Sequence, residues 1–155
     1  MPEAWRLTRA KYAATAFDGE GARMHGGRWN SRGVGVVYAS AAISLAALEM
    51  LVHIDPMLPI RYVTIAVEFD DDMVEELPVG KLTPAWRGEP PGPATKSIGD
   101  AWARRARSAV LKLPSVIVPS EFNYLINPSH PDFARLRIGI PVAFAFDSRL
   151  LKTRP

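Results

Sequence analysis

The chain has 155 residues, with 19 Lys and Arg against 16 Asp and Glu, 14 prolines and no cysteine. This length accommodates one domain rather than two, so we expect a single domain over residues 1–155. The missing cysteine excludes disulfide scaffolds, thiolate zinc sites and cysteine nucleophiles. Apolar residues at 48% and charged residues at 23% are ordinary globular usage and argue against disordered, collagen-like and coiled-coil chains.

The first half of the chain predicts strands around one long loop and one apolar helix. Residues 5–7 open a strand, and the glycine-rich stretch 18–33 is typical of a long shaped loop. Residues 34–39 are β-branched and aromatic and predict a buried strand. Ser40 is then expected to cap a helix that runs to about Ile54.

The middle of the chain contains its clearest strand. Residues 61–69 alternate, with four apolar residues on one face. Residues 73–77 suggest a helical turn, and the proline-rich stretch 82–95 an irregular connection. Ser97 with Asp100 resembles a capping box, so we expect a helix over 97–112.

Three short extended segments complete the pattern, at 115–119, 123–127 and 141–146. Several strands with two substantial helices indicate an α+β fold rather than alternating βαβ units. The longest uncharged run, 33–48, has 16 residues including glycines and serines. A membrane span needs about 20 mostly apolar residues, so we expect a cytoplasmic protein that does not cross a membrane.

Glu49 is the most informative single position. It is the only charged residue between Gly33 and Val52, and its spacing from Leu45 and Val52 places it on the apolar stripe of the predicted helix. A carboxylate there either lies at the stripe's edge, reaching water or pairing with His53, or is held at a cleft for chemistry. The pattern leaves both interpretations open.

Two further segments carry candidate binding groups. In residues 26–30, two glycines precede Arg28, so the backbone could bend closely around a ligand and offer a guanidinium to phosphate or carboxylate; a surface turn with a solvated arginine is the alternative. Tyr38 could present its ring to a flat ligand or simply belong to the core. The stretch 113–133 concentrates small polar residues, including Ser115, Ser120 and Asn123, beyond what its Asn-Pro and His-Pro turns require.

Several familiar motifs are missing from the sequence. Neither of the two G-x-G starts completes a dinucleotide-binding fingerprint, and there is no phosphate-binding P-loop. Ser120 is not in a nucleophile elbow. The three histidines are isolated, so we predict no metal site.

Taken in order, these segments resemble the RES domain, a family of bacterial toxins named for its characteristic Arg, Glu and Ser. The resemblance covers most of the chain, through Trp5-Arg6 and residues 27–30, 37–39, 47–53, 113–119 and 123–133. It implies a fold similar to ADP-ribosyltransferases, with a split, mixed β-sheet core flanked by helices and NAD in the cleft. Carried over by motif, the family's Arg, Glu and Ser are Arg28, Glu49 and Ser115, joined by Tyr38 and Arg6.

The resemblance also implies a mechanism and a partner. NAD+ is the substrate rather than a cofactor, and Glu49 would stabilise positive charge on the ribose as the nicotinamide bond breaks. Arg28 and Arg6 would hold phosphate oxygens, Tyr38 would stack on nicotinamide or pack on its ribose, and Ser115 would bind the ribose or orient Glu49. A helix-turn-helix antitoxin of the Xre type would block the site, and a homodimer within that complex is a possible assembly.

We therefore predict a toxin that depletes NAD+ by hydrolysis or phosphorolysis. The main alternative keeps the site and the first step but transfers ADP-ribose to a cellular protein. A basic nucleic-acid-binding module is a second alternative, motivated by the sequence pI near 9.4. Its weakness is the lack of a basic stripe with interleaved aromatic residues, since the dense cluster of Arg104, Arg105 and Arg107 fits a solvated helix face. A non-catalytic regulatory subunit is a third.

Overall fold

The computed structural model describes residues 2–55 and 58–152, which together form an α+β fold. Three α-helices are present in this part of the chain: α1 (Glu20–His25), α2 (Ile43–Leu51) and α3 (Pro93–Arg105). Its strands are β1 (Glu3–Arg9), β2 (Val37–Ser40), β3 (Tyr62–Glu68), β4 (Val74–Glu76), β5 (Val110–Pro114), β6 (Phe122–Ile126), β7 (Arg137–Ile138) and β8 (Val142–Phe144). Short 3-10 turns connect them: η1 (Ala10–Thr15), η2 (Asp71–Met73), η3 (Val79–Lys81), η4 (Pro84–Arg87), η5 (Pro131–Arg135) and η6 (Ser148–Leu151).

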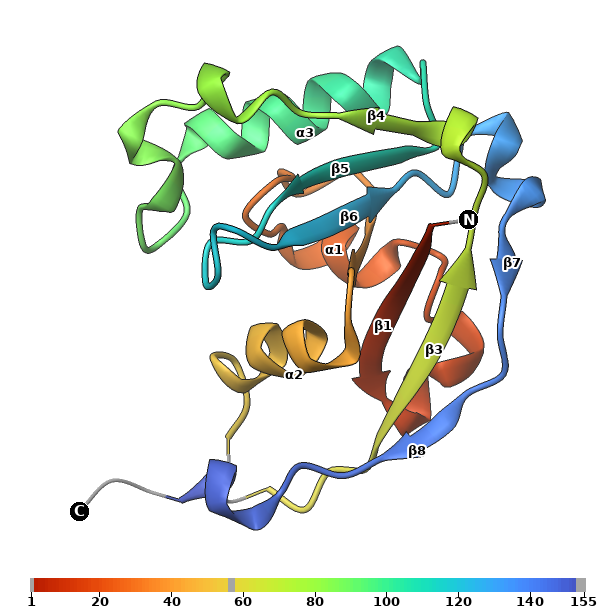
Figure 1. The fold of residues 1–155 in the computed structure, drawn as a ribbon, viewed down its shortest axis with the longest axis vertical. Helices are drawn as coiled ribbons and strands as arrows, with labels where there is room; N and C mark the ends of the chain where they lie inside the picture. The colour runs from red at the N-terminus through yellow and green to blue at the C-terminus, as the bar shows by residue number, and fades with distance from the viewer. Residues whose placement is uncertain (1, 56–57, 153–155) are drawn as a thin grey trace.

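These eight strands form one mixed sheet in the order β4-β5-β6-β2-β1-β3-β7, with β8 also paired to β3. The β4–β5 pair is parallel and the other pairs are antiparallel. β1 and β2 align at one register position, Trp5 with Ser40, whereas β1 and β3 align over their full seven residues. In Figure 1, β4, β5 and β6 cross the upper part of the molecule, and β1 and β3 run steeply down its lower right. The mixed α+β architecture predicted from the sequence is confirmed.

The strands predicted from local alternation are confirmed in place, with small shifts at their ends. The segments 5–7, 34–39, 61–69, 123–127 and 141–146 overlap β1, β2, β3, β6 and β8 respectively. Of the predicted apolar face of β3, Ile65 and Val67 are buried, as is Phe69 just beyond it. The loop predicted over 18–33 contains the short helix α1 and a bridge between Gly27 and Asn30.

Three predictions from residue 73 onward were wrong. The helix expected over 97–112 is α3, which begins at Pro93 and ends where Ala106 adopts a left-handed conformation (φ 53°). Residues from Val110 onward then form β5, because a short buried apolar run fits a strand as well as a helix. The helical turn expected at 73–77 is largely β4, whose backbone pairs with β5. The strand expected at 115–119 is a turn, closed by the Ser115 hydroxyl on two backbone N–H groups.

Two predicted helix caps were also wrong. The residue that caps α2 is Ala42, and Ser40 instead lies at the end of β2, where its hydroxyl reaches across to β6. Asp100 lies inside α3 and bonds to a distant loop rather than to its own helix. Both residues use their polar groups over long sequence separations, which a local capping pattern does not reveal.

The sheet packs apolar residues on both faces. On one face, Val37, Ile65 and Phe69 belong to a buried cluster that extends along most of the sheet. On the other, Trp29 of the loop and Trp102 of α3 pack over β5 and β6 in a second cluster. A third cluster joins α2 to Leu7 and Tyr62. Figure 1 shows α3 alongside β4, and α2 below β6.

Candidate active site

Most of the predicted site residues gather on one face of the β2–β6–β5 part of the sheet. Ser40 of β2 and Leu113 of β5 are both register partners of Asn123 on β6. Cross-strand partners project to the same face, as do alternate residues of one strand. Tyr38, Ser40 and Asn123 therefore share a face, and Ser115 continues it just beyond the end of β5.

Glu49 reaches this face from α2. The helix is anchored by buried Leu45 and Ala46, and the Glu49 side chain is half-buried. Its Oε1 accepts a hydrogen bond from Ser115 Oγ at 2.7 Å and another from Asn123 Nδ2 at 2.7 Å. The pairing with His53 considered from the sequence is replaced by these two contacts.

The electrostatic character of Glu49 follows from those partners. Both donors are neutral, and no cation in the described ranges forms an ion pair with this carboxylate. Oε2 accepts no hydrogen bond from the same residues. The site thus presents one carboxylate oxygen with its negative charge uncancelled, which suits stabilisation of positive charge developing on a ligand.

Ser115 is fully buried and its hydroxyl has several partners. Oγ donates to Glu49, and it accepts from the N–H groups of Ile117 and Val118 at 3.1 Å each. Its own N–H donates to the Glu121 carbonyl at 2.9 Å, which closes the connection from β5 to β6. Ser115 is therefore placed against Glu49 by the tight turn that follows β5.

Two residues of this cluster were absent from the predicted site. Asn123 contacts Glu49 directly, and Ser40 Oγ donates to Asn123 Oδ1 at 2.7 Å. In the sequence, Asn123 is one of several polar residues in a short stretch, and Ser40 has the pattern of a helix cap. The sequence signal for both was small polar side chains at strand ends.

Arg28 lies in a loop that α3 holds in place. Thr95 Oγ1 donates to the Arg28 carbonyl at 2.6 Å, and Lys96 Nζ to the Gly27 carbonyl at 2.7 Å. Asp100 accepts from the backbone N–H and the hydroxyl of Ser31 at 2.8 and 2.6 Å. These bonds span 66 or more residues of sequence, so the loop's shape is set by tertiary contacts.

The Arg28 guanidinium points to the proline-rich stretch. Nη1 donates to the carbonyls of Trp86 and Gly88 at 3.0 and 2.9 Å, and Nη2 forms an ion pair with Glu89 Oε2 at 2.8 Å. The Arg28 side chain is 11% exposed and that of Glu89 is 75% exposed. In the free protein, the Arg28 guanidinium is therefore already paired with an acidic side chain.

Tyr38 connects the Arg28 loop to the sheet. Its hydroxyl accepts from the Trp29 N–H at 3.0 Å and donates to Asn30 Oδ1 at 2.6 Å. A Cβ on Gly27 would lie 2.6 Å from this hydroxyl, so only glycine allows this close approach. Burial raises the pKa of the Tyr38 hydroxyl well above its usual value, which keeps it protonated as a donor.

Arg6 bridges the weakly paired strands β1 and β2. Its Nε donates to the Ala16 carbonyl at 2.7 Å and its Nη1 to the Tyr38 carbonyl at 3.0 Å. Burial lowers the pKa of Arg6, and the nearby Asp18 opposes that effect. Nη2 makes no hydrogen bond with the described residues, so it is the nitrogen that could face a phosphate.

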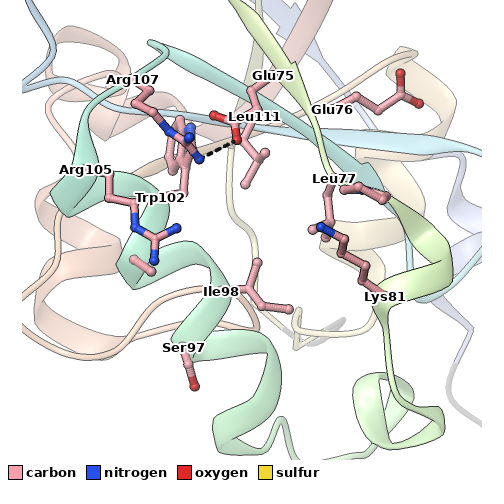
Figure 2. A pocket seen from close by; sticks show the side chains of 12 residues that line it. Glu75, Glu76, Leu77, Lys81, Ser97, Ile98, Trp102, Arg105, Arg107 and Leu111 are labelled. Atoms are coloured by element: carbon pink, nitrogen blue, oxygen red, sulfur yellow. Dashed lines mark hydrogen bonds and ion pairs between the residues drawn. The ribbon is translucent and has the colours of Figure 1, made fainter.

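A separate hollow of about 360 Å³ lies between α3 and β4 (Figure 2). Ile98, Trp102 and Leu111 form its apolar floor, and Arg105 and Arg107 lie at its rim. The predicted site residues do not line it. Arg107 forms an ion pair with Glu75 across it at 3.5 Å.

No cluster of three or more potential metal-ligating side chains occurs in residues 2–55 and 58–152. Within those same ranges, no helix combines the length and the apolar character that a membrane span requires.

Comparison with known proteins identifies close relatives across nearly the whole chain. The RES domain model matches residues 3–147. A protein from Sphingobium sp. named "Prs ADP-ribosylating toxin" is 39% identical and covers 96% of each chain, and a "Toxin Res" from Photorhabdus laumondii is 36% identical and covers 97% of each. The fold resembles the crystal structure of the M. tuberculosis MbcT–MbcA toxin–antitoxin complex, with a TM-score of 0.77 and 18% identity, over 96% of this chain and 86% of that one. This likeness confirms the predicted fold class.

Proposed function

The chain belongs to the RES domain family, and from that premise we propose that it is a toxin that consumes NAD+ by cleaving the nicotinamide N-glycosidic bond. The observation that carries the proposal is the Glu49 carboxylate, fixed through one oxygen by Ser115 and Asn123 and uncancelled by a cation. It shares a sheet face with Tyr38, whose hydroxyl in turn holds the Arg28 loop.

The chemistry follows from the charge that develops during cleavage. As the bond from the ribose C1′ to the nicotinamide nitrogen breaks, its electron pair leaves with nicotinamide and the ribose acquires oxocarbenium character. Glu49 Oε2 accepts a hydrogen bond from a ribose hydroxyl and stabilises that positive charge. Water or phosphate then forms the new bond to C1′, and water releases its proton to solvent.

The arginines orient the dinucleotide in this scheme. Arg28 exchanges the Glu89 carboxylate for phosphate oxygens while it keeps its two carbonyl contacts. Arg6 has Nη2 left to add a second contact to the pyrophosphate. Tyr38 offers its ring to the nicotinamide ribose, because its hydroxyl is already bonded to the loop.

One test uses purified chain and NAD+ labelled in both the nicotinamide and the adenylate halves. We expect free nicotinamide to accumulate and Glu49→Gln to lower the rate by about 100- to 1000-fold. The amide oxygen of Gln can still accept from Ser115 and Asn123, so the fold is retained and the charge alone is lost. Glu20→Gln on α1, an exposed partner of Arg23, is the matched control and should leave the rate unchanged. Wild-type chain that releases no nicotinamide, with or without phosphate and lysate, refutes the proposal.

The name of the Sphingobium relative, which describes an ADP-ribosylating toxin, supports a protein as an alternative acceptor of the ADP-ribose group. The same first step would then transfer ADP-ribose to a cellular protein. In the labelling experiment, adenylate label on a lysate protein supports this transferase, whereas label recovered as free ADP-ribose or its phosphate supports depletion.

We also propose an antitoxin partner. The structural neighbour was solved as a toxin–antitoxin complex, and the resemblance noted in the sequence adds an Xre-type helix-turn-helix antitoxin that covers the site. Co-expression with the protein encoded next to this chain should give a stable complex in which nicotinamide release is suppressed.

A further inference from the structure

We propose that Asn123 is a positioning residue for Glu49, and that Ser40 acts through it. The inference rests on the proposed function, because it concerns the orientation of the carboxylate that stabilises the ribose. It is carried by a continuous chain of hydrogen bonds from Ser40 to Asn123 to Glu49, completed from the other side by Ser115.

In this series of hydrogen bonds, the donor and acceptor capacity of each group determines which atom donates. An ionised carboxylate only accepts hydrogen bonds, so Asn123 must turn its amide nitrogen to Glu49. Its carbonyl oxygen then faces Ser40, whose hydroxyl must donate to it. Ser40 is 4% exposed, so water cannot readily take its place as the donor.

Ser115 also positions Glu49, and its own hydrogen-bonding capacity shows why. A hydroxyl has one donor and two acceptor sites, and Ser115 uses the donor on Glu49 and both acceptor sites on Ile117 and Val118. Its hydroxyl has no capacity left for a ribose, and its side chain is fully buried. Of the two roles considered for Ser115, the geometry points to orienting Glu49.

Two donors on one oxygen constrain Glu49 more than either alone. With only the Ser115 bond, the carboxylate can pivot about that contact. The Asn123 bond comes from β6 and the Ser115 bond from the turn after β5, so two separate segments hold Oε1, and neither of them bonds to Oε2. Misplacement of a reacting group by about 1 Å can lower a rate by roughly 100-fold.

The experiment measures kcat, KM and melting temperature for nicotinamide release. Asn123→Ala should lower kcat by about 10- to 100-fold while KM stays within about twofold, because phosphate contacts are unaffected. Asn123→Asp keeps the shape but loses the donor, and we expect a loss at least as large. Ser40→Ala should have a smaller effect, Ser40→Thr should restore it, and the double alanine variant should be no slower than Asn123→Ala alone.

Asn127, just beyond the opposite end of β6, provides a control with a similar pair of hydrogen bonds. It is buried, its Nδ2 donates to the Ala103 carbonyl at 3.1 Å, and its Oδ1 accepts from the Ser129 N–H at 3.0 Å. Asn127→Ala removes a comparable pair of bonds without touching Glu49. It should lower the melting temperature and leave kcat unchanged in the folded fraction.

The outcomes separate the two proposals. Nicotinamide release by wild type with unchanged kcat in Asn123→Ala and Asn123→Asp overturns the positioning role and leaves the proposed function intact. Equal kcat losses in Asn123→Ala and Asn127→Ala also overturn it, because general destabilisation would then explain both. Wild type without any nicotinamide release refutes the proposed function, and the positioning role with it.

Discussion

Gly99→Ala is the substitution for which the structure makes the sharpest prediction of stability. Gly99 is a buried residue inside α3, and a Cβ there would lie 1.7 Å from the Trp29 carbonyl oxygen. Ala is normally better than Gly in a helix interior by about 1 kcal/mol, so helix propensity alone predicts stabilisation. The close approach of α3 to the loop predicts the opposite.

The contact dominates because backbone cannot move aside as a side chain can. Restoring van der Waals contact requires α3 and the loop to separate by roughly 1.5 Å or more. That movement strains or breaks the bonds from Thr95, Lys96 and Asp100 to the loop. Overpacking costs about 1–3 kcal/mol, and each lost bond about 1 kcal/mol or more. We expect a net destabilisation of about 2–4 kcal/mol after the helix gain is subtracted.

Thermal unfolding monitored by circular dichroism measures this effect. At about 2–4 °C per kcal/mol for a chain of this size, the melting temperature should fall by roughly 4–16 °C. Gly21→Ala in α1 is the matched control, because nothing lies within 4 Å of its Cβ position. Its melting temperature should stay the same or rise slightly.

A Gly99→Ala variant at least as stable as wild type would refute this reasoning. It would mean that α3 does not approach the Trp29 backbone as closely as the structure shows. Nicotinamide release provides a second readout, because the same displacement moves the loop that carries Arg28; activity should fall even at temperatures where the variant is folded.

Three further predictions concern the surroundings of the site. Tyr38→Phe removes two hydrogen bonds and leaves a partner in the loop unsatisfied, which should destabilise the fold by about 1–3 kcal/mol in urea unfolding. Glu89→Gln should lower the KM for NAD+, because its carboxylate no longer competes with phosphate for Arg28; a raised KM would instead mean that Glu89 helps to bind substrate. Hydrogen bonding to Arg135 lowers the pKa of Asp70, so this contact stabilises the fold above the usual Asp pKa of about 3.9 and is lost as pH falls through the lowered value. Arg135→Ala should therefore be less stable than wild type at pH 7, and the difference should shrink as pH falls below the usual Asp pKa; a difference that does not shrink contradicts the assignment.

The sequence predicted those elements whose signal is local. The alternation over 61–69 is sufficient to define β3, because Ile65, Val67 and Phe69 on one face are buried. The error at 97–112 arose where the chain reverses between Ala106 and Val110, a feature set by packing of β5 in the sheet. The strand at 74–76 similarly depends on its partner β5, which lies more than thirty residues further along the chain.

In the candidate site too, residues with a local sequence signal could be predicted, and residues defined by long-range contacts could not. Glu49 stood out because it is the lone charge on an apolar helix, which is visible in sequence. Asn123 and Ser40 did not, because the bond between them joins residues 83 positions apart and a serine before a helix has the ordinary appearance of a cap. The hydrogen bonds from Ser31 to Asp100 join residues 69 positions apart, so the sequence pattern wrongly suggested that Asp100 belongs to a local capping box.

The attachment of the Arg28 loop to α3 has a consequence for the thermodynamics of ligand binding. A glycine-containing loop ordinarily loses backbone entropy when it closes on a ligand, at about 1–2 kcal/mol per residue fixed. Here Thr95, Lys96 and Asp100 restrain the loop during folding, so that entropy is already lost before NAD+ arrives. Amide hydrogen exchange at Trp29 and Ser31 should therefore be slow in the free protein and change little when NAD+ is added, whereas disrupting α3 should accelerate exchange in the loop.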